Sequence, residues 1–243
     1  QPRVDAVADR LVQRGYHEAI TYSFVDPRVQ SLLVPGEPAM TLANPISADL
    51  AVMRLSLWPG LLKACADNQR HQQPRVRLFE TGRRFTGTGD ELREVAVVAG
   101  VAAGASFPEQ WGEPARDVDF FDLKADVEAL LCMSGDQRSF AFQPAEHPAL
   151  HPGQSARILR DGAPVGWIGR VHPRVVKLLE LTYSGLVFEL DIERALAALL
   201  PAHREISRFP AVRRDLAFVV DESVRMQEIE ACIRGAAGAL LTD

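Results

Sequence analysis

The stretch SARILRDGAPVGWIGRV, residues 155–171, decides the fold. Two runs rich in Ile and Val, Ser155–Arg160 and Val165–Val171, flank the pair Asp161-Gly162. An Asp-Gly pair between two such runs is a strong signal for a tight turn that joins antiparallel strands. The sequence therefore predicts an antiparallel hairpin here, which favours a sheet built mainly of antiparallel strands.

Outward from the hairpin, the remaining segments lack the regular β-α-β alternation that a parallel sheet requires. Apolar or alternating runs predict strands, and amphipathic runs bounded by proline, aspartate or glycine predict helices. We therefore expect an α+β fold, an antiparallel sheet flanked by helices. The expected strands are Glu18–Val25 (ended by Asp26-Pro27), Arg75–Glu80, Val95–Val101 and Gly185–Asp191; the expected helices are Val4–Arg14, Ser56–His71, one from Asp119 or Asp122 to Gly135, a short one from Pro173, and Ile192–Leu200.

A second pattern begins after Pro201 and the polar segment that follows it. Asp215–Val220 predicts a strand and Met226–Ala236 predicts an amphipathic helix. A β-α pair of about 37 residues cannot bury a core by itself. We expect residues 1–202 to form one domain. The segment 207–243 then either stops inside a second domain or continues beyond residue 243.

The composition predicts a folded intracellular chain. Hydrophobic residues make up 47% and charged residues 24% of 243 positions, which is ordinary for globular proteins. No apolar run approaches the roughly 20 residues of a membrane span, and the N-terminus lacks a signal peptide. Because the sequence does not begin with methionine, we expect it to belong to a longer gene product.

Charge and cysteine content narrow the classes of function. The formal charge of −5 disfavours a globally basic nucleic-acid binder but permits a local basic patch. Cys65, Cys132 and Cys232 lie far apart among apolar neighbours. They are therefore predicted to be small buried hydrophobes, not zinc ligands or disulfide partners.

The sequence contains no phosphate-binding loop of the G-x-x-x-x-G-K-[ST] type. Thr86–Asp90 (TGTGD) is predicted to be a turn because it does not open a helix. His147 and His151 have the spacing of two metal ligands on a helix, but a proline follows each of them, as it follows His172. We interpret all three as structural loop histidines and predict no metal site.

Acidic residues gather at one predicted helix, at Asp122, Asp126 and Glu128. Acidic side chains in a first helical turn complement the helix dipole. A solvated helix cap is therefore a better interpretation of this group than a catalytic pair.

Basic residues gather before the predicted strand of the second unit. Arg208, Arg213 and Arg214 surround Phe209-Pro210. A small basic patch with one aromatic ring suits contact with nucleic-acid phosphate. The whole segment 207–243 is close to neutral, so such a contact would be local.

Several segments, taken in order, carry a resemblance. They are GYHEAITYSFV (15–25), NPIS with VMRLSLWPGLL (44–62), LFETGRRF (78–85), DFFDLKADVEALL (119–131), HPGQSARI (151–158), GWIGRVHP (166–173), FELDIE (188–193) and SRFPAVRRDLAFVVDE (207–222). Together they resemble the family of β subunits of bacterial phenylalanyl-tRNA synthetases, over nearly the whole chain.

The resemblance implies a module like the catalytic domain of class II aminoacyl-tRNA synthetases up to about residue 200. It implies that residues 207–243 are the first β-α unit of a ferredoxin-fold anticodon-binding domain, truncated after its first strand and helix. The implied partners are a catalytic α subunit, in an (αβ)₂ heterotetramer, and tRNA(Phe), in the cytoplasm. The holoenzyme would use ATP and Mg²⁺, but its magnesium site lies upstream of the matched region, so the resemblance implies no bound cofactor and no metal in this chain.

Class II catalysis uses two arginines to stabilise the transferring phosphates, one on a motif-2 strand and one after a glycine-rich motif-3 strand. At the motif-2 place this chain has Arg77 and Glu80 in an R-x-x-E arrangement instead of R-x-E, so a strand would turn them to opposite faces. At the motif-3 place Arg194 is kept, but bulky residues stand where backbone must approach the nucleotide: Val187, Phe188 and Leu190. We predict that Arg77, Glu80 and Arg194 are vestigial, that Arg194 is a surface residue, and that the chain has no catalytic residue.

The opening helix and the NPIS segment fall where class II enzymes form dimer interfaces. By resemblance, we predict that Val4, Val7, Leu11 and the stretch Asn44–Arg54, with Asn44, Pro45 and Arg54, face the α subunit or a neighbouring helix. Packing within the chain is the alternative for these residues. Two other functions also stay open: a free-standing enzyme that activates an amino acid by itself, and a regulatory module that senses an amino acid.

Overall fold

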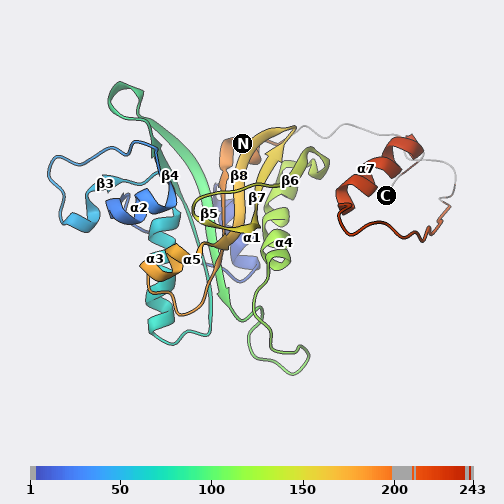
Figure 1. Ribbon diagram of the computed structural model, residues 1–243, viewed down its shortest axis with the longest axis horizontal. Coiled ribbons are helices and arrows are strands. Elements are labelled where there is room, and N and C mark those ends of the chain that lie inside the picture. Colours follow the sequence, from blue (N-terminus) through green and yellow to red (C-terminus); the bar gives the residue numbers. More distant parts are fainter. Residues whose placement is uncertain (1–3, 199–209, 211, 239–240, 242–243) are drawn as a thin grey trace. The chain divides into compact units, whose positions relative to one another are not determined.

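The computed structural model describes residues 4–198, 210, 212–238 and 241. Contacts divide the chain into two units, Gln1–Pro201 and Ala202–Asp243. The first unit contains a seven-stranded sheet and a small two-stranded sheet (Figure 1). No helix among the described residues is long and apolar enough to cross a membrane.

The large sheet has the strand order β1-β4-β5-β9-β8-β7-β6. Every neighbouring pair is antiparallel except β1 and β4, which are parallel. The mainly antiparallel sheet expected from the sequence is therefore confirmed. Its strands are β1 (His17–Glu18), β4 (Arg75–Thr86), β5 (Arg93–Gly104), β9 (Leu186–Asp191), β8 (Ala163–Val171), β7 (Leu150–Arg160) and β6 (Phe140–Pro144); the small sheet pairs β2 (Phe24–Val25) with β3 (Val52–Met53).

Helices pack on both faces of the large sheet. One face is covered by α1 (Val4–Gln13), α4 (Phe120–Leu131) and the short α6 (Ile192–Ala195). The other face is covered by α3 (Trp58–Arg70), with α2 (Pro27–Leu33) and α5 (Pro173–Leu178) beside it. Each face therefore has its own hydrophobic core.

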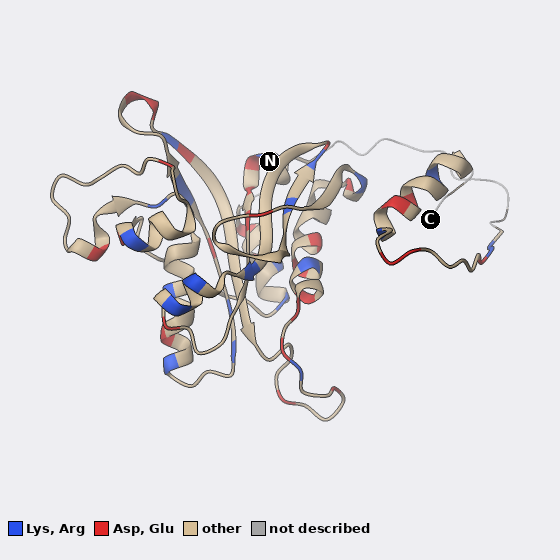
Figure 2. Ribbon diagram, viewed as in Figure 1, with Lys and Arg blue, Asp and Glu red and all other residues tan. Residues whose placement is uncertain are grey.

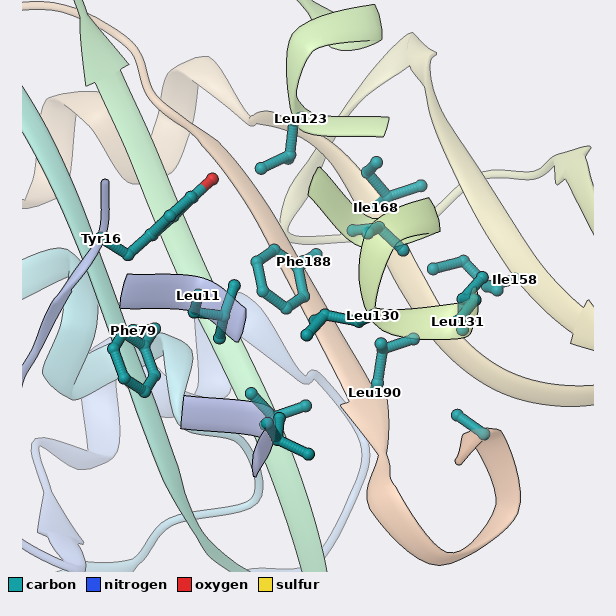
Figure 3. Close-up of a cluster of buried hydrophobic side chains, with 14 of the residues drawn as sticks. Leu11, Tyr16, Phe79, Leu123, Leu130, Leu131, Ile158, Ile168, Phe188 and Leu190 are labelled. Carbon is teal, nitrogen blue, oxygen red and sulfur yellow. The ribbon is translucent and has the colours of Figure 1, made fainter. Parts of the chain in front are cut away.

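Strand alternation explains the two cores. Leu186, Phe188 and Leu190 of β9 point into the core under α4, whereas Val187 points into the core under α3. Figure 3 shows Leu130 of α4 beside Phe188 and Leu190. Because both faces are covered, β5 is a nearly continuous run of buried small apolar residues, as its sequence predicted.

Local signals in the sequence placed several elements correctly. Asp161 and Gly162 both have positive φ, 49° and 79°, and join β7 to β8 as the expected hairpin turn. Asp119 caps α4 by accepting from the backbone N–H groups of Phe121 and Asp122. The turn expected at Thr86–Asp90 does lie between β4 and β5.

Other expectations were wrong. The strand predicted at Glu18–Val25 is interrupted, because the chain leaves the sheet after Ala19, whose N–H donates to the carbonyl of Phe79. Asp26-Pro27 does more than end a strand: Asp26 accepts from the N–H of Arg28 and caps α2, a helix that the sequence analysis missed. Of the helix expected at Ile192–Leu200, α6 covers Ile192–Ala195, and residues 199 and 200 lie outside the described part.

In the second unit, the predicted helix is present as α7 (Met226–Ala237), but the predicted strand Asp215–Val220 is not. A strand needs a neighbour to accept and donate its backbone hydrogen bonds. None of the strands that the structure describes pairs with this segment, and its side chains are exposed. The prediction that the cysteines are buried holds for Cys65, whereas Cys132 is half-buried and Cys232 on α7 is exposed.

Candidate functional site

The strands β4 and β9 carry the charged residues that the sequence analysis placed at the motif-2 and motif-3 positions. Arg77 and Glu80 of β4 are both buried but point to opposite faces of the sheet, as strand alternation predicted. They therefore cannot act on one ligand together. Each instead meets a partner of opposite charge within the chain.

Arg77 belongs to the Asp126 cluster, which we define as Arg14, Tyr16, Arg77 and Asp126. The Asp126 carboxylate accepts from Arg77 NH1 at 2.7 Å, from the Tyr16 hydroxyl at 2.8 Å and from Arg14 Nε. Asp126 is only 2% exposed, so the interpretation of this residue as part of a solvated helix cap was wrong. Burial also raises the pKa of Tyr16, which keeps its hydroxyl a hydrogen-bond donor.

On the opposite face, Glu80 binds Arg54. The Glu80 carboxylate accepts from Arg54 NH1 and from the Thr21 hydroxyl, each at 2.7 Å. Arg54 Nε also donates to the carbonyl of Arg83 at 2.9 Å. Arg54 is 4% exposed, so its predicted place in a subunit interface was wrong, and the alternative of packing within the chain holds.

The bulky residues of β9 fill the space beside the neighbouring strands, as predicted. The ring of Phe188 lies against Gly100 of β5, where an added Cβ would be 2.4 Å from the ring. Phe188 and Leu190 have no exposed surface. Arg194 is exposed and pairs with Asp191 at 3.5 Å, which confirms it as a surface residue.

Glu189 is a buried charged residue that the sequence analysis did not single out. Its carboxylate accepts from the Ser56 hydroxyl at 2.7 Å and from the backbone N–H of Leu57 at 2.8 Å, and Arg84 NH1 lies at 3.3 Å. Burial raises the pKa of Glu189. A carboxylate inside the otherwise apolar segment LVFEL was the available signal that this strand holds an internal charge.

These arrangements do not fit ATP or a metal ion. Arg77 and Arg54 are held by carboxylates in the interior, so neither presents a free guanidinium to a phosphate. Among the described residues, no group of three His, Cys, Asp or Glu side chains could hold a metal. In the described part of this unit, these buried charges bind one another and stabilise the fold.

The histidines have structural surroundings. His147 lies between Trp58 and Trp167, with ring centroids 5.2 and 4.8 Å away, and its Nδ1 accepts from the N–H of Ala149. His172 accepts from the N–H of Arg174 and caps α5. Burial lowers the pKa of His147 to about 4, with the nearby Arg157 charge acting in the same direction.

The predicted interface residues separate into two groups. Val7 and Leu11 of α1 have no exposed surface and pack in the core with α4, so they cannot meet another subunit, and the neighbouring helix is their partner. Val4, Asn44 and Pro45 are exposed, and their place in a subunit interface stays a prediction.

Among the predicted tRNA-binding residues, Arg213 and Arg214 are exposed. Arg208 lies outside the described residues. Their role in binding RNA stays a prediction.

Two family models match the chain. Residues 1–192 match the phenylalanyl tRNA synthetase beta chain CLM domain, and residues 207–243 match the ferredoxin-fold anticodon binding domain. The phenylalanine–tRNA ligase beta subunit of Pseudomonas fluorescens is 52% identical over 233 residues, 96% of this chain and 29% of that protein. That of Nitrosococcus oceani is 47% identical over 241 residues, 99% of this chain and 30% of that protein. The chain thus spans less than a third of the length of these relatives.

Solved structures share the fold. Two structures of pyrrolysyl-tRNA synthetase from Desulfitobacterium hafniense align with TM-scores of 0.57 and 0.60, each at 14% identity. The alignments cover 81% and 79% of this chain, and 68% and 66% of those chains. This likeness concerns the fold alone, and it supports the synthetase-like α+β class expected from the sequence.

Replacement of Asp126 by Asn is expected to lower the free energy of unfolding by about 3–5 kcal/mol, because it leaves the buried Arg77 guanidinium without a counter-charge. Urea denaturation of the chain measures the change. Glu128→Gln on the same helix is the matched control: Glu128 forms an exposed pair with Lys124, whose loss should cost about 0.5 kcal/mol or less. Equal losses in the two variants would contradict the central role of Asp126.

His147 is expected to make the fold sensitive to acid. Its pKa is about 4 in the folded chain against 6.5 when unperturbed, so the unfolded state binds the proton more readily and stability falls as pH drops from 6.5 towards 4. Between pH 7 and pH 5 the wild type should lose roughly 2 kcal/mol more than His147→Asn. Denaturation of both proteins at the two pH values measures the free energies of unfolding. Equal losses in the two proteins would show that burial does not shift the pKa of His147.

Proposed function

The chain belongs to the family of phenylalanyl-tRNA synthetase β chains, and from that premise we propose that it is a non-catalytic part of the ligase that joins phenylalanine to tRNA(Phe). In this proposal the first unit serves subunit assembly and the second begins the tRNA-binding part. The α subunit, paired in an (αβ)₂ heterotetramer in the cytoplasm, carries out the reaction of ATP, phenylalanine and tRNA(Phe). ATP and Mg²⁺ are used elsewhere in that assembly.

The observation that carries the proposal is the internal pairing of Arg77 and Glu80 on β4. A cation that stabilises a transferring phosphate must be free to approach it. Arg77 is 7% exposed and bound to Asp126, and withdrawing it would leave the carboxylate buried without its main partner, at a cost of several kcal/mol. A synthetase-like sheet whose charges are used in this way supports a scaffold function.

Two alternatives predict different behaviour of the chain. A free-standing enzyme would catalyse phenylalanine-dependent exchange between ATP and pyrophosphate without an α subunit. A regulatory module would bind free amino acid with micromolar affinity, which calorimetry measures. The paired charges of β4 and the Phe188 ring against Gly100 favour neither.

Co-expression of the complete β subunit containing this chain with its α subunit is expected to yield one complex that aminoacylates tRNA(Phe). The β subunit alone should give no ATP–pyrophosphate exchange. Within the complex, Arg194→Ala should leave kcat unchanged, because Arg194 lies on the surface and pairs only with Asp191 among the described residues. Exchange activity of the β subunit alone, or failure to associate with the α subunit, would overturn the proposal.

Reversal of charge at Arg213 and Arg214 in that complex is expected to raise the KM for tRNA roughly tenfold and to leave ATP–pyrophosphate exchange intact, because exposed cations near RNA act on its phosphates and not on the adenylation step. Steady-state aminoacylation at several tRNA concentrations measures the effect. The matched control reverses Arg10 and Arg138, two exposed arginines of the first unit. An unchanged KM in the Arg213/Arg214 variant would make those arginines structural.

A further inference from the structure

We propose that the surface formed by the end of β8 and by α5 binds the phosphate backbone of RNA. This inference rests on the proposed function, in which the assembly binds tRNA, and it adds a contact on the synthetase-like unit. The three cations concerned are Arg170, Arg174 and Lys177, which we call the α5 cations.

The α5 cations form a local excess of positive charge in an acidic chain. Between Asp161 and Glu180 the sequence has these three Lys and Arg residues and no acidic residue, although the chain as a whole has a net charge of −5. Figure 2 shows Lys and Arg positions on α5. Within the part of the chain that the structure describes, none of the three has an ion-pair partner, in contrast to Arg54 and Arg77.

Two of the three α5 cations border a hollow of about 330 Å³ beside α5, whereas Arg174 is exposed on the same helix and does not line the hollow. Arg170 and Lys177 lie on its wall together with His151 and Ser184. Arg170 Nε donates to the Gln154 side chain at 2.6 Å, which orients the guanidinium and leaves its terminal nitrogens free among the described residues. A guanidinium fixed in this way can bind two oxygens of one phosphate group.

One acidic residue, Glu180, lines the same hollow, but its charge is already matched. Its carboxylate pairs with Arg70 NH2 at 3.3 Å. Arg70 and Glu180 also line a neighbouring, larger hollow of about 660 Å³ between α2, α3 and α5. The net charge beside the α5 cations is therefore positive even when Glu180 is counted.

RNA fits this surface better than an acidic protein does. The wall of the hollow combines cations with apolar side chains, among them Val171, Val176 and Leu181. An RNA backbone alternates anionic phosphates with ribose faces, which matches that combination. Arg174 and Lys177 lie three positions apart on α5, so they share one helical face and can contact successive phosphates.

The test uses the complete α–β complex and unmodified tRNA(Phe) transcript. The variant Arg174→Gln/Lys177→Gln changes two exposed side chains, and a triple variant adds Arg170→Gln. The matched control is Arg10→Gln/Arg138→Gln, with the same loss of charge on other elements. Filter binding measures the association constant for tRNA at salt concentrations between about 50 and 200 mM. The slope of its logarithm against the logarithm of the salt concentration reports the number of phosphate contacts.

We expect the double variant to lower the magnitude of this slope by about 2 and the triple variant by about 3, with weaker tRNA binding at each salt concentration, while the control matches wild type. Phenylalanine-dependent ATP–pyrophosphate exchange should not change. Slopes equal to wild type in both variants would overturn this inference and leave the proposed function intact. The inference would also be overturned if the double variant bound the α subunit less well while the complex that still formed kept its tRNA affinity. That result would assign the surface to a protein partner. Failure of the wild-type subunits to associate would instead refute the proposed function.

Discussion

The buried carboxylate of Asp126 is the interaction on which the arrangement of one sheet face depends. It accepts from Arg14 at the end of α1, from Tyr16 just before β1 and from Arg77 on β4, so a single side chain of α4 fixes two helices and two strands. Its partners carry two positive charges, and the loss of the carboxylate would leave Arg77 uncompensated in the interior. The apolar residues of α1 and α4, among them Val7, Leu11, Leu123 and Val127, pack in the same core as Tyr16.

Strand β4 also carries a buried charge that needs a partner on the other face of the sheet. Strand alternation turns Glu80 away from Arg77, and Glu80 binds Arg54 and Thr21 in the region where α3 begins. Thr21 approaches Gly60 of α3 so closely that an added Cβ would lie 2.2 Å from its hydroxyl oxygen. Glu189 of β9 binds Ser56 and Leu57 at the start of the same helix. The carboxylates of Glu80 and Glu189, one on each strand, therefore position the start of α3.

The sequence predicted those features that depend on neighbours in the chain. The Asp161-Gly162 turn, the Asp119 cap and the small apolar run of β5 are local signals, and each was found where expected. The burial of Asp126 was missed because its partners lie 49, 110 and 112 positions away. On its own helix an aspartate in the first two turns looks like a cap. The prediction of a strand at Asp215–Val220 was wrong for the converse reason. The composition of this segment suits a strand, but pairing needs a neighbouring strand that the described residues do not provide.

Two groups of arginines in this chain differ in their surroundings, and the difference decides what each group can do. Arg54 and Arg77 are buried with carboxylates, so a ligand could recruit either one only by breaking an ion pair inside the protein. Arg174, Arg213 and Arg214 are exposed, and contact with a phosphate would displace only water and counterions. A phosphate ligand therefore gains more binding free energy from the exposed arginines than from the buried Arg54 and Arg77. Because Arg54 and Arg77 are committed to packing, the cations that a polyanion such as RNA can contact without breaking an internal ion pair are those on the surface.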